Sequence, residues 1–489
     1  MTDPTIRLPA VLGIGFTGHR TLREEAPCRQ AILDFLREQQ AKSSGHVYGI
    51  SSAAAGGDLL FAESCMELGI PLRVLLPMAR EEFRRDFDAA SWTRAEEVLG
   101  RAASVEVTAG SEDRREQFYD CGVLTVQQSQ VLLALWDGQP SRGMGGTAEI
   151  VAFAETIGRP VVWLHSETCE PQVRNGGAIG KTLDDPELNF LNGLSDRGIR
   201  GNSDDPASLA CAWFSKVDAN ASRLAPVARR LASVPVLYTA AAALFSAFAA
   251  HARNAAAWLG VSMVLGVFAV VLPQVLGLDS RQRKWARTRT AAEVCRSYLA
   301  LWNAPLAYDA IGPEMLPELA GVLTSLGYLR LRDEKRKAVS LEEFRKEYGE
   351  RRLEDQIGYF AEKAAGATRE ARIYRGLTWS SGVLAVLTAG WLFAGRGHLP
   401  FSRRWMELLI STLFQLATVA GALVVINDCD RRRERYRELE QWLRNWVSQF
   451  GALQTWSSLQ RVTARVERAL VVELLEWRSL TRHAKLPRK

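Results

Sequence analysis

Three glycine-bearing loops carry the residues best suited to bind a ligand. The first contains Thr17, Gly18, His19 and Arg20. Amides without a bulky side chain nearby, together with a guanidinium that can form two parallel hydrogen bonds, make a cradle for phosphate oxygens. The alternative is a tight strand-to-helix turn that carries a surface arginine.

The same loop has the glycine spacing of a dinucleotide-binding motif, at Gly13, Gly15 and Gly18. That motif needs an acidic residue at the end of the following strand, about 20 residues further on. Gly13 is expected inside a strand, and Asp34, the acid near this distance, is expected inside a helix. We therefore predict no dinucleotide-dehydrogenase site.

The second loop contains Ser51, Gly56, Gly57 and Asp58, and it opens a helix. Free amides at a helix start favour an anion or a ribose. Asp58 suits sugar hydroxyls, because its charge would repel a phosphate. Capping of the helix N-terminus is an equally good interpretation of Asp58.

The third loop follows an expected strand and runs into the next helix. Its candidate residues are Asp137, Gly143, Gly145, Gly146, Thr147 and Glu149. The glycines permit close approach of a ligand to the backbone. Thr147 supplies a hydroxyl, and the Glu149 carboxylate could serve as a general base. Both side chains could instead only stabilise the helix start.

These loops belong to a region of alternating strands and helices that extends to about Ser166. Short apolar strands are expected at residues 11–16, 47–51, 72–76, 105–107, 131–136 and 160–164. Strands that alternate with helical stretches predict a parallel sheet with helices on both faces. Ligands of such sheets bind at the carboxyl ends of the strands, where the three loops lie. The sequence therefore predicts an α/β, Rossmann-like ligand-binding domain.

Four apolar stretches downstream are long enough to cross a membrane. They are residues 231–250, 255–278, 376–394 and 405–426. About 20 helical residues cover the roughly 30 Å hydrocarbon core. The short breaks within each pair predict two antiparallel hairpins. Buried core helices of a soluble protein are the alternative, but such helices usually carry a polar stripe.

Basic residues flank both hairpins on the same side. They are Arg223, Arg229, Arg230, Arg281, Arg283, Lys284, Arg287, Arg372, Arg375, Arg431, Arg432, Arg433 and Arg435. Because Lys and Arg accumulate on the cytoplasmic side, the N-terminal domain and the C-terminus are expected in the cytoplasm. Arg396, Arg403 and Arg404 would lie outside, in contact with lipid headgroups.

The hairpins are copies of each other. Tyr359 matches Trp213 at a shift of 146 residues (359 − 213), and Arg431 matches Arg283 at 148 (431 − 283). Both copies start on the same side of the membrane, so this repeat is parallel. Glu407, near the start of the fourth span, is the only carboxylate expected within the spans. No transporter-like ion site is expected. Small residues in the first span favour close helix packing and a homo-oligomer.

Composition excludes several other classes of protein. The chain has 489 residues and a net charge of +6, and its positive charge lies beside the apolar spans, which indicates lipid headgroups as its partners, not DNA. Seven scattered cysteines without a CxxC pair argue against a disulfide framework. The histidines lack ligand-like spacing, so no metal is proposed. Residues 1–9 lack a signal peptide, so the soluble half is expected in the cytoplasm.

Motifs in the first 165 residues together resemble the SLOG superfamily. They are Thr17-Gly18-His19-Arg20, Gly56-Gly57-Asp58, Leu76-Pro77 with Glu82-Phe83 and Asp86-Phe87, and Trp136-Asp137-Gly138 with Gly145-Gly146-Thr147-Ala148-Glu149. The duplicated spans with their trailing helices resemble SLATT, a two-span effector domain found beside SLOG modules.

The resemblance implies a bacterial inner-membrane effector of anti-phage defence. Its soluble domain would bind a nucleotide-derived second messenger, of the cyclic ADP-ribose type or a cyclic or linear oligonucleotide, and its spans would form a pore or disrupt the bilayer. The organisation expected is a SLOG-like domain at 1–170, a linker at 171–205, a two-span unit at 206–310, a charged connector at 311–358 and a second two-span unit at 359–489.

One departure from the family concerns enzymatic activity. Lonely-Guy phosphoribohydrolases, which belong to the same superfamily, carry a proline-led glycine loop and a paired arginine and glutamate. Here Gly143-Met144-Gly145 replaces that loop, and only Arg142 and Arg115 lie near Glu149. We therefore expect a ligand-gated effector without a cofactor. The alternatives are a membrane-anchored nucleotide N-glycosidase that uses Glu149, and a membrane scaffold that recruits a partner.

Overall fold

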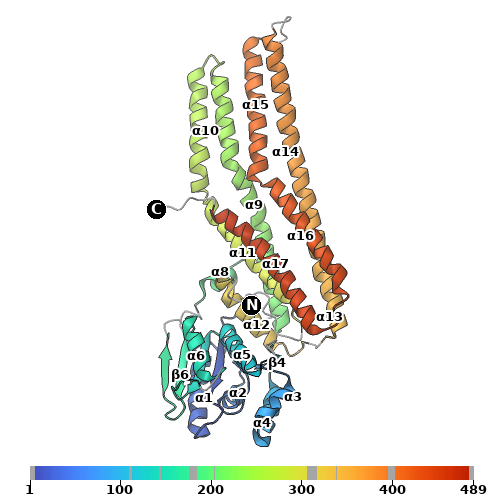
Figure 1. Ribbon diagram of the computed structural model, residues 1–489. Coiled ribbons are helices and arrows are strands. Elements are labelled where there is room, and N and C mark those ends of the chain that lie inside the picture. The colour runs from blue at the N-terminus through green and yellow to red at the C-terminus, as the bar shows by residue number, and fades with distance from the viewer. Residues whose placement is uncertain are drawn as a thin grey trace. The chain divides into compact units, whose positions relative to one another are not determined.

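The computed structural model describes residues 6–108, 113–141, 145–175, 184–202, 204–304, 316–336, 339–394 and 402–483. It divides the chain into two compact units, each built from two separate segments (Figure 1). The first, here called the α/β unit, comprises residues 1–217 and 293–339. The second, the helical unit, comprises residues 218–292 and 340–489.

The α/β unit contains a sheet of seven strands within the described residues. Their order across the sheet is β4 (Ser104–Val107), β3 (Leu72–Leu76), β2 (Val47–Ser51), β1 (Leu12–Gly18), β5 (Val131–Trp136), β6 (Val161–His165) and β7 (Pro171–Arg174). All neighbours pair in parallel except β6 and β7, which are antiparallel. The α/β class expected from the sequence is confirmed, whereas β7 was not predicted.

Helices connect the parallel strands. They are α1 (Glu25–Lys42), α2 (Gly57–Glu67), α3 (Arg80–Phe83), the 3-10 turn η1 (Arg84–Asp86), α4 (Ala89–Arg101), α5 (Arg114–Gln128) and α6 (Thr147–Thr156). Strands β2, β3 and β4 follow one another on one side of β1, each beside the strand that precedes it in the chain. The chain then returns to place β5 on the other side of β1. This reversal creates a switch point between β1 and β5, where open α/β sheets form their ligand crevice.

Alternate side chains of the central strands form two apolar cores, one on each face of the sheet. Ile14 and Phe16 of β1 are buried in the core that includes side chains of α1, α2 and α4. Leu132 and Ala134 of β5 are buried in the other core, with residues of α5 and α6. Because both faces are covered, the strands are almost continuously apolar, as is typical of parallel sheets.

Further helices complete the α/β unit. They are α8 (Pro186–Asn192), the first part of α9 (Pro206–Ala249), the last part of α11 (Leu278–Ala300), the turn η3 (Pro317–Leu319) and α12 (Ala320–Arg332). From α12, the Ser325 hydroxyl donates to the carbonyl of Pro9 at 2.6 Å, and Thr324 accepts from Gln130 Nε2 at 2.9 Å. Segments on both sides of the first hairpin therefore pack in the same unit.

The helical unit consists of long helices. Besides the remainders of α9 and α11, it contains α10 (Ala255–Val275), α13 (Leu341–Tyr348), the π-helical turn η4 (Gly349–Glu354), α14 (Asp355–Phe393), α15 (Arg403–Ile426), α16 (Cys429–Phe450) and α17 (Trp456–His483). Helices α9 and α10 form one hairpin, and α14 and α15 the other (Figure 1). In the first hairpin, Phe245 stacks on Trp258, and the Ser262 hydroxyl donates to Ala242 at 2.7 Å.

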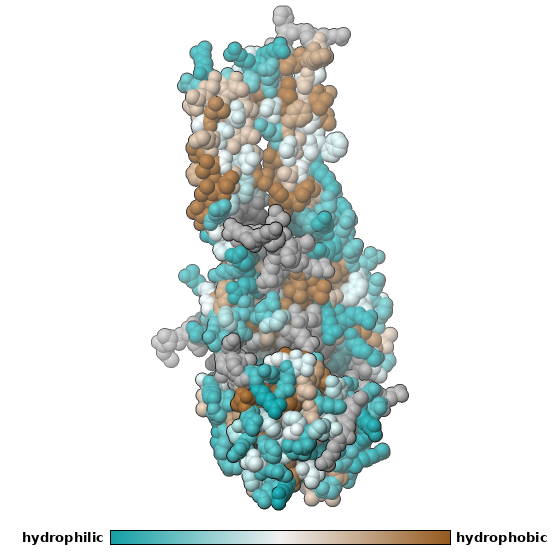
Figure 2. Space-filling model, turned by 60° about the vertical axis from the view of Figure 1, so that its left-hand side comes forward, coloured by the Kyte–Doolittle hydropathy of each residue, from teal (hydrophilic) through white to brown (hydrophobic). Residues whose placement is uncertain are grey.

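Three of the described helices are long and apolar enough to cross a membrane. They are Ala255–Val275 and the helical stretches Leu341–Phe393 and Arg403–Phe450. Only 6%, 11% and 6% of their most apolar windows are buried, so these side chains form a surface and not a core. Figure 2 shows hydrophobic residues gathered over the hairpin helices. The span expected at 231–250 is not confirmed, because its described apolar stretch, Ser233–Ala249, is shorter.

Each hairpin ends at a residue in the left-handed conformation. Gly277, with φ of 58°, separates α10 from α11, and Asp428, with φ of 47°, separates α15 from α16. Helices α11 and α16 start 151 residues apart (429 − 278), three more than the shift of 148 that pairs their arginines in the sequence. The two copies thus share the same break between an apolar helix and a basic one.

Candidate ligand-binding site

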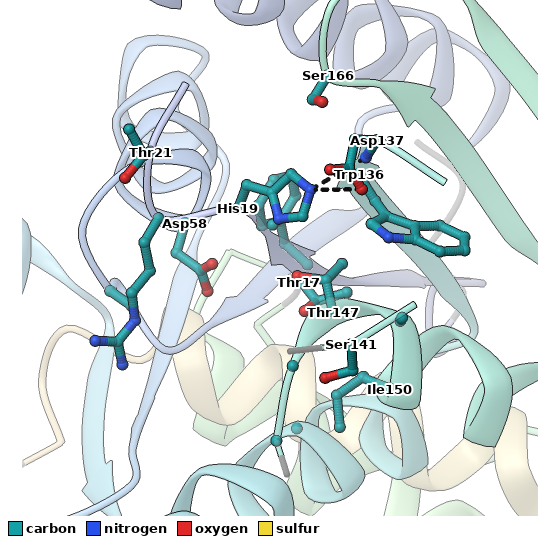
Figure 3. A pocket seen from close by; sticks show the side chains of 18 of the residues that line it. Thr17, His19, Thr21, Asp58, Trp136, Asp137, Ser141, Thr147, Ile150 and Ser166 are labelled. Carbon is teal, nitrogen blue, oxygen red and sulfur yellow. Dashed lines mark hydrogen bonds and ion pairs between the residues drawn. The ribbon is translucent and has the colours of Figure 1, made fainter. Parts of the chain in front are cut away.

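A cavity of about 760 Å³ opens at the carboxyl ends of β1 and β5. It lies at the switch point of the sheet, where the loops after β1, β2 and β5 all contribute to its wall. Figure 3 shows their side chains around one hollow. A concave site with a few convergent polar groups is the usual form of a small-molecule pocket.

All four candidate residues of the first loop, from Thr17 to Arg20, line the cavity. His19 lies at the centre of this loop: its backbone nitrogen donates to Leu135 at 3.1 Å, and its Nε2 accepts from the backbone nitrogen of Asp137 at 3.1 Å (Figure 3). Gly18 closes β1 in register with Leu135. The loop after β1 is therefore fastened to the end of β5.

Arg20 lies at the wall with half of its side chain exposed (49%). Its guanidinium stacks over the Phe118 ring, 4.8 Å from the centroid, and lies 3.8 Å from a carboxylate oxygen of Asp86. Arginine keeps its charge at all physiological pH values and can form two parallel hydrogen bonds with phosphate. The exposed cation can therefore meet an anionic group at the cavity without breaking a tight ion pair.

Asp58 is almost fully buried at the cavity wall, at 6% exposure. Its Oδ1 accepts hydrogen bonds from Ser52 at 2.8 Å and from Ser51 at 3.2 Å. Burial raises the pKa of Asp58 to about 6, against the opposing effects of the two serines, Arg20 and the Gly18 backbone. At neutral pH the carboxyl group is therefore mainly ionised, and a carboxylate oxygen can accept a hydrogen bond from a ligand hydroxyl group.

Ser51, Gly56 and Gly57 lie behind the wall and do not line the cavity. Gly56 has φ of 86° and ψ of −126°, and a Cβ there would collide with the carbonyl of Arg20. The next amide, that of Gly57, donates to the carbonyl of His19 at 2.9 Å. These glycines therefore position the first loop, because they allow two backbones to approach closely.

In the third loop, Asp137, Gly145, Gly146 and Thr147 line the cavity, whereas Gly143 lies outside the described residues. Burial would raise the pKa of Asp137, but hydrogen bonds from the Gln139 amide and from His19 lower it below its ordinary value. Asp137 is therefore a carboxylate at neutral pH.

Glu149 does not line the cavity. Its Oε2 accepts from the backbone nitrogen of Gly145 at 2.7 Å, which closes the turn before α6. This bond resembles the return bond of a capping box, in which a glutamate in the first helical turn binds an amide before the helix. Of the two arginines near Glu149 in the sequence, Arg142 lies outside the described residues, and Arg115 does not contribute to the wall.

Several wall residues were not among the candidates. They are mainly apolar side chains and residues from segments without a motif: Phe16, Arg23, Phe118, Trp136, Ile150, Ser166 and Glu167. Trp136 was predictable as a wall residue, since it directly precedes Asp137 at the end of a predicted strand. Phe118 was not predictable, because the order of the strands in the sheet determines that α5 lies at this edge.

No protein-family model and no curated protein matches this chain. Its class is therefore defined by fold and site: a doubly wound α/β unit with a pocket at its switch point, in one chain with three helices long and apolar enough to cross a membrane. Within the described ranges, no group of three or more His, Cys, Asp or Glu residues is arranged to hold a metal ion.

Proposed function

We propose that this protein is a ligand-gated membrane effector. Its α/β unit binds a nucleotide-derived second messenger, and binding makes the apolar helices open or disrupt the bilayer. The observation that carries the proposal is the cavity at the switch point, which occurs in the same chain as three unburied apolar helices. The resemblance of its motifs to SLOG domains, and of its duplicated spans to SLATT, supports our proposal that this activity serves bacterial anti-phage defence.

The cavity wall offers partners for each part of a nucleotide. Arg20 can bind a phosphate, while Asp58 and Ser52 can bind sugar hydroxyls. Phe118 and Trp136 supply aromatic surface for a base. A messenger of the cyclic ADP-ribose type or an oligonucleotide contains all three groups.

Gating requires that the messenger bind the active state more tightly than the resting state, since equal affinity shifts no equilibrium. Helices α9 and α11 each contribute residues to both units. The α/β unit and the helical unit are therefore joined by a helical segment of the chain at two places. We propose that the active state is a homo-oligomer, because the apolar windows of the hairpins are left almost unburied by the chain itself.

Hydrolysis of a nucleotide is a weaker proposal. The Glu149 carboxylate, which would serve as the base, is bonded to Gly145 and does not line the cavity. If the protein nevertheless released a base from nucleoside monophosphates, and Glu149→Gln abolished this turnover, an enzyme would replace the effector.

The test uses full-length protein in liposomes loaded with a self-quenching dye. Cyclic ADP-ribose and small-molecule extracts of phage-infected bacteria are the probes, and extracts of uninfected bacteria are the control. We expect dye release only with a messenger-containing probe, strongly reduced in Arg20→Ala. Arg37→Ala is the matched control, because Arg37 is equally exposed (49%) and lies on α1, outside the cavity wall. Equal release with every probe and with buffer would exclude gating.

A further inference from the structure

Two cysteine thiols meet beside the cavity. Cys28 is buried in the first turns of α1, and Cys169 is half-buried in the turn between β6 and β7. Their sulfur atoms are 3.0 Å apart, in contact as one thiol donates to the other. Both cysteines are free thiols in the structure. A disulfide bond is about 2.05 Å long, so bond formation requires the sulfur atoms to approach by only about 1 Å.

The turn that carries Cys169 holds it in place. The Cys169 amide donates to His165 at 2.8 Å, and its φ of 56° lies in the left-handed region. Cys28 Sγ also lies 3.6 Å from the carbonyl oxygen of Ser166. The same turn contains Ser166 and Glu167, which line the cavity.

We propose that Cys28 and Cys169 form a reversible disulfide when a peroxide oxidises them, and that this bond fixes the cavity wall at Ser166 and Glu167. Cytosolic thiols are normally kept reduced, and a disulfide in this compartment is typically a transient, redox-sensing one. The bond would join α1, which follows the first loop of the site, to the turn that follows β6.

The more exposed thiol reacts first. The Cys169 thiolate attacks one peroxide oxygen and becomes a sulfenic acid, while the O–O bond breaks. Cys28 then attacks the Cys169 sulfur, and the oxygen leaves as water. In total, two thiols and one hydrogen peroxide give one disulfide and two waters. Burial and the contact with Cys169 raise the pKa of Cys28 to about 12, so Cys28 is not the thiol that reacts with peroxide. In the second step the Cys28 proton passes to the hydroxyl group that leaves the Cys169 sulfur as water.

Mass spectrometry of the full-length protein tests the bond. After treatment with hydrogen peroxide, alkylation of free thiols and digestion with trypsin, peptide 24–29 should be linked to peptide 143–174, each of which contains one cysteine. Dithiothreitol should release the link, and Cys28→Ser or Cys169→Ser should abolish it. Cys211→Ser, which removes an exposed thiol, should retain it. Overoxidised Cys169 without the link, or Cys169 linked to Cys211, would overturn the proposal.

Hydrogen exchange of the same samples tests the effect on the wall. The amides of residues 166–168 should exchange severalfold more slowly in the oxidised protein than in the reduced protein or in Cys28→Ser. Unchanged exchange despite the link would refute the effect on the wall. Any change of messenger affinity rests on the proposed function, and loss of binding in both redox states would contradict that function without affecting the disulfide.

Discussion

The Nε2 atom of His19 lies 3.1 Å from the backbone nitrogen of Asp137 and 3.1 Å from its Oδ1. A neutral imidazole accepts the amide proton, whereas a protonated imidazole donates to the carboxylate. In either state the ring bridges the ends of β1 and β5, on the two sides of the switch point. The His19 side chain therefore adds a second link between the two strand ends, besides the bond from its backbone nitrogen to Leu135.

Replacement of this ring should loosen the wall. His19→Ala removes the acceptor of the Asp137 amide, and loss of one such hydrogen bond typically costs about 1 kcal/mol. We expect the Asp137 amide to exchange with solvent faster by up to about tenfold, as measured by hydrogen exchange with mass spectrometry. An unchanged rate would mean that another group holds the loop.

Gly56 and Gly45 have the same positive φ but different surroundings. Both have φ of +86°, but a Cβ at Gly56 meets the Arg20 carbonyl, whereas at Gly45 nothing lies within 4 Å. Gly45→Ala should cost about 1–2 kcal/mol of stability from the left-handed conformation alone. Gly56→Ala should cost clearly more and abolish ligand binding. Thermal unfolding curves of the two variants that coincide would contradict the proposed role of Gly56.

Asp58 should make the α/β unit less stable as pH rises. Its pKa of about 6 in the folded protein exceeds the ordinary aspartate value of 3.8, so between these pH values the folded state keeps a proton that the unfolded state has lost. Stability therefore falls from about pH 4 to pH 6 and stays lower above that range. The shift corresponds to a loss on the order of 3 kcal/mol.

The neutral variant Asp58→Asn should remove this pH dependence. Its stability relative to the natural protein should be higher at pH 8 than at pH 4.5, as followed by tryptophan fluorescence during heating. Asp34→Asn, at an exposed position of α1, is the control and should show the same difference at both pH values. An equal response of the two variants would contradict the burial effect.

Adjacent arginines of the helical unit should differ greatly in their contribution to stability. Arg352 forms a buried pair with Glu467, at 2.6 Å and 2.9 Å, and Tyr348 donates to the same carboxylate at 2.6 Å. Arg352→Ala would leave a buried carboxylate without its cation, at a cost of about 3–5 kcal/mol. Arg351 pairs with Glu347 at the surface, so Arg351→Ala should cost about 0.5 kcal/mol or less. Tryptophan fluorescence during thermal unfolding in detergent measures both.

Cysteine labelling in intact bacteria tests the proposed topology, in which both ends of the chain are cytoplasmic and the membrane is the bacterial inner membrane. An Asn254→Cys variant places a thiol in the exposed turn between α9 and α10. A membrane-impermeant maleimide that reaches the periplasm should label it, whereas exposed Cys211 of the α/β unit should react only after the inner membrane is permeabilised. Labelling of both cysteines in intact bacteria, or of neither, would exclude this topology.

Strands that are buried on both faces were predictable in detail. The expected ranges 47–51, 72–76 and 131–136 coincide with β2, β3 and β5, because a short apolar run between turn residues has few other interpretations. Strand β7 is the opposite case. Its Pro171, Gln172 and Val173 are exposed, and Arg174 is only partly buried, so no apolar pattern marks it. It exists because β6 offers an edge for antiparallel pairing.

The loops of the site were predictable, but the direction of each side chain was not. Ser51 and Ser52 are adjacent, yet only Ser52 lines the cavity, because successive residues point to opposite sides of an extended chain. The Glu149 carboxylate accepts a hydrogen bond from the Gly145 amide. The sequence alone is equally compatible with a Glu149 side chain that points into solvent. The start of the first apolar span could not be located from the sequence. Helix α9 is one helix from Pro206 to Ala249, so no break in the helix marks where an apolar segment begins.

The interleaved order of the two units has a consequence for how the protein is made. The α/β unit includes residues 293–339, and Ser325 and Thr324 of this segment bond to Pro9 and Gln130. A ribosome synthesises the first hairpin before it reaches these residues. The α/β unit is therefore still incomplete when the first hairpin leaves the ribosome. Under the proposed function, this hairpin would enter the membrane before the α/β unit can finish folding.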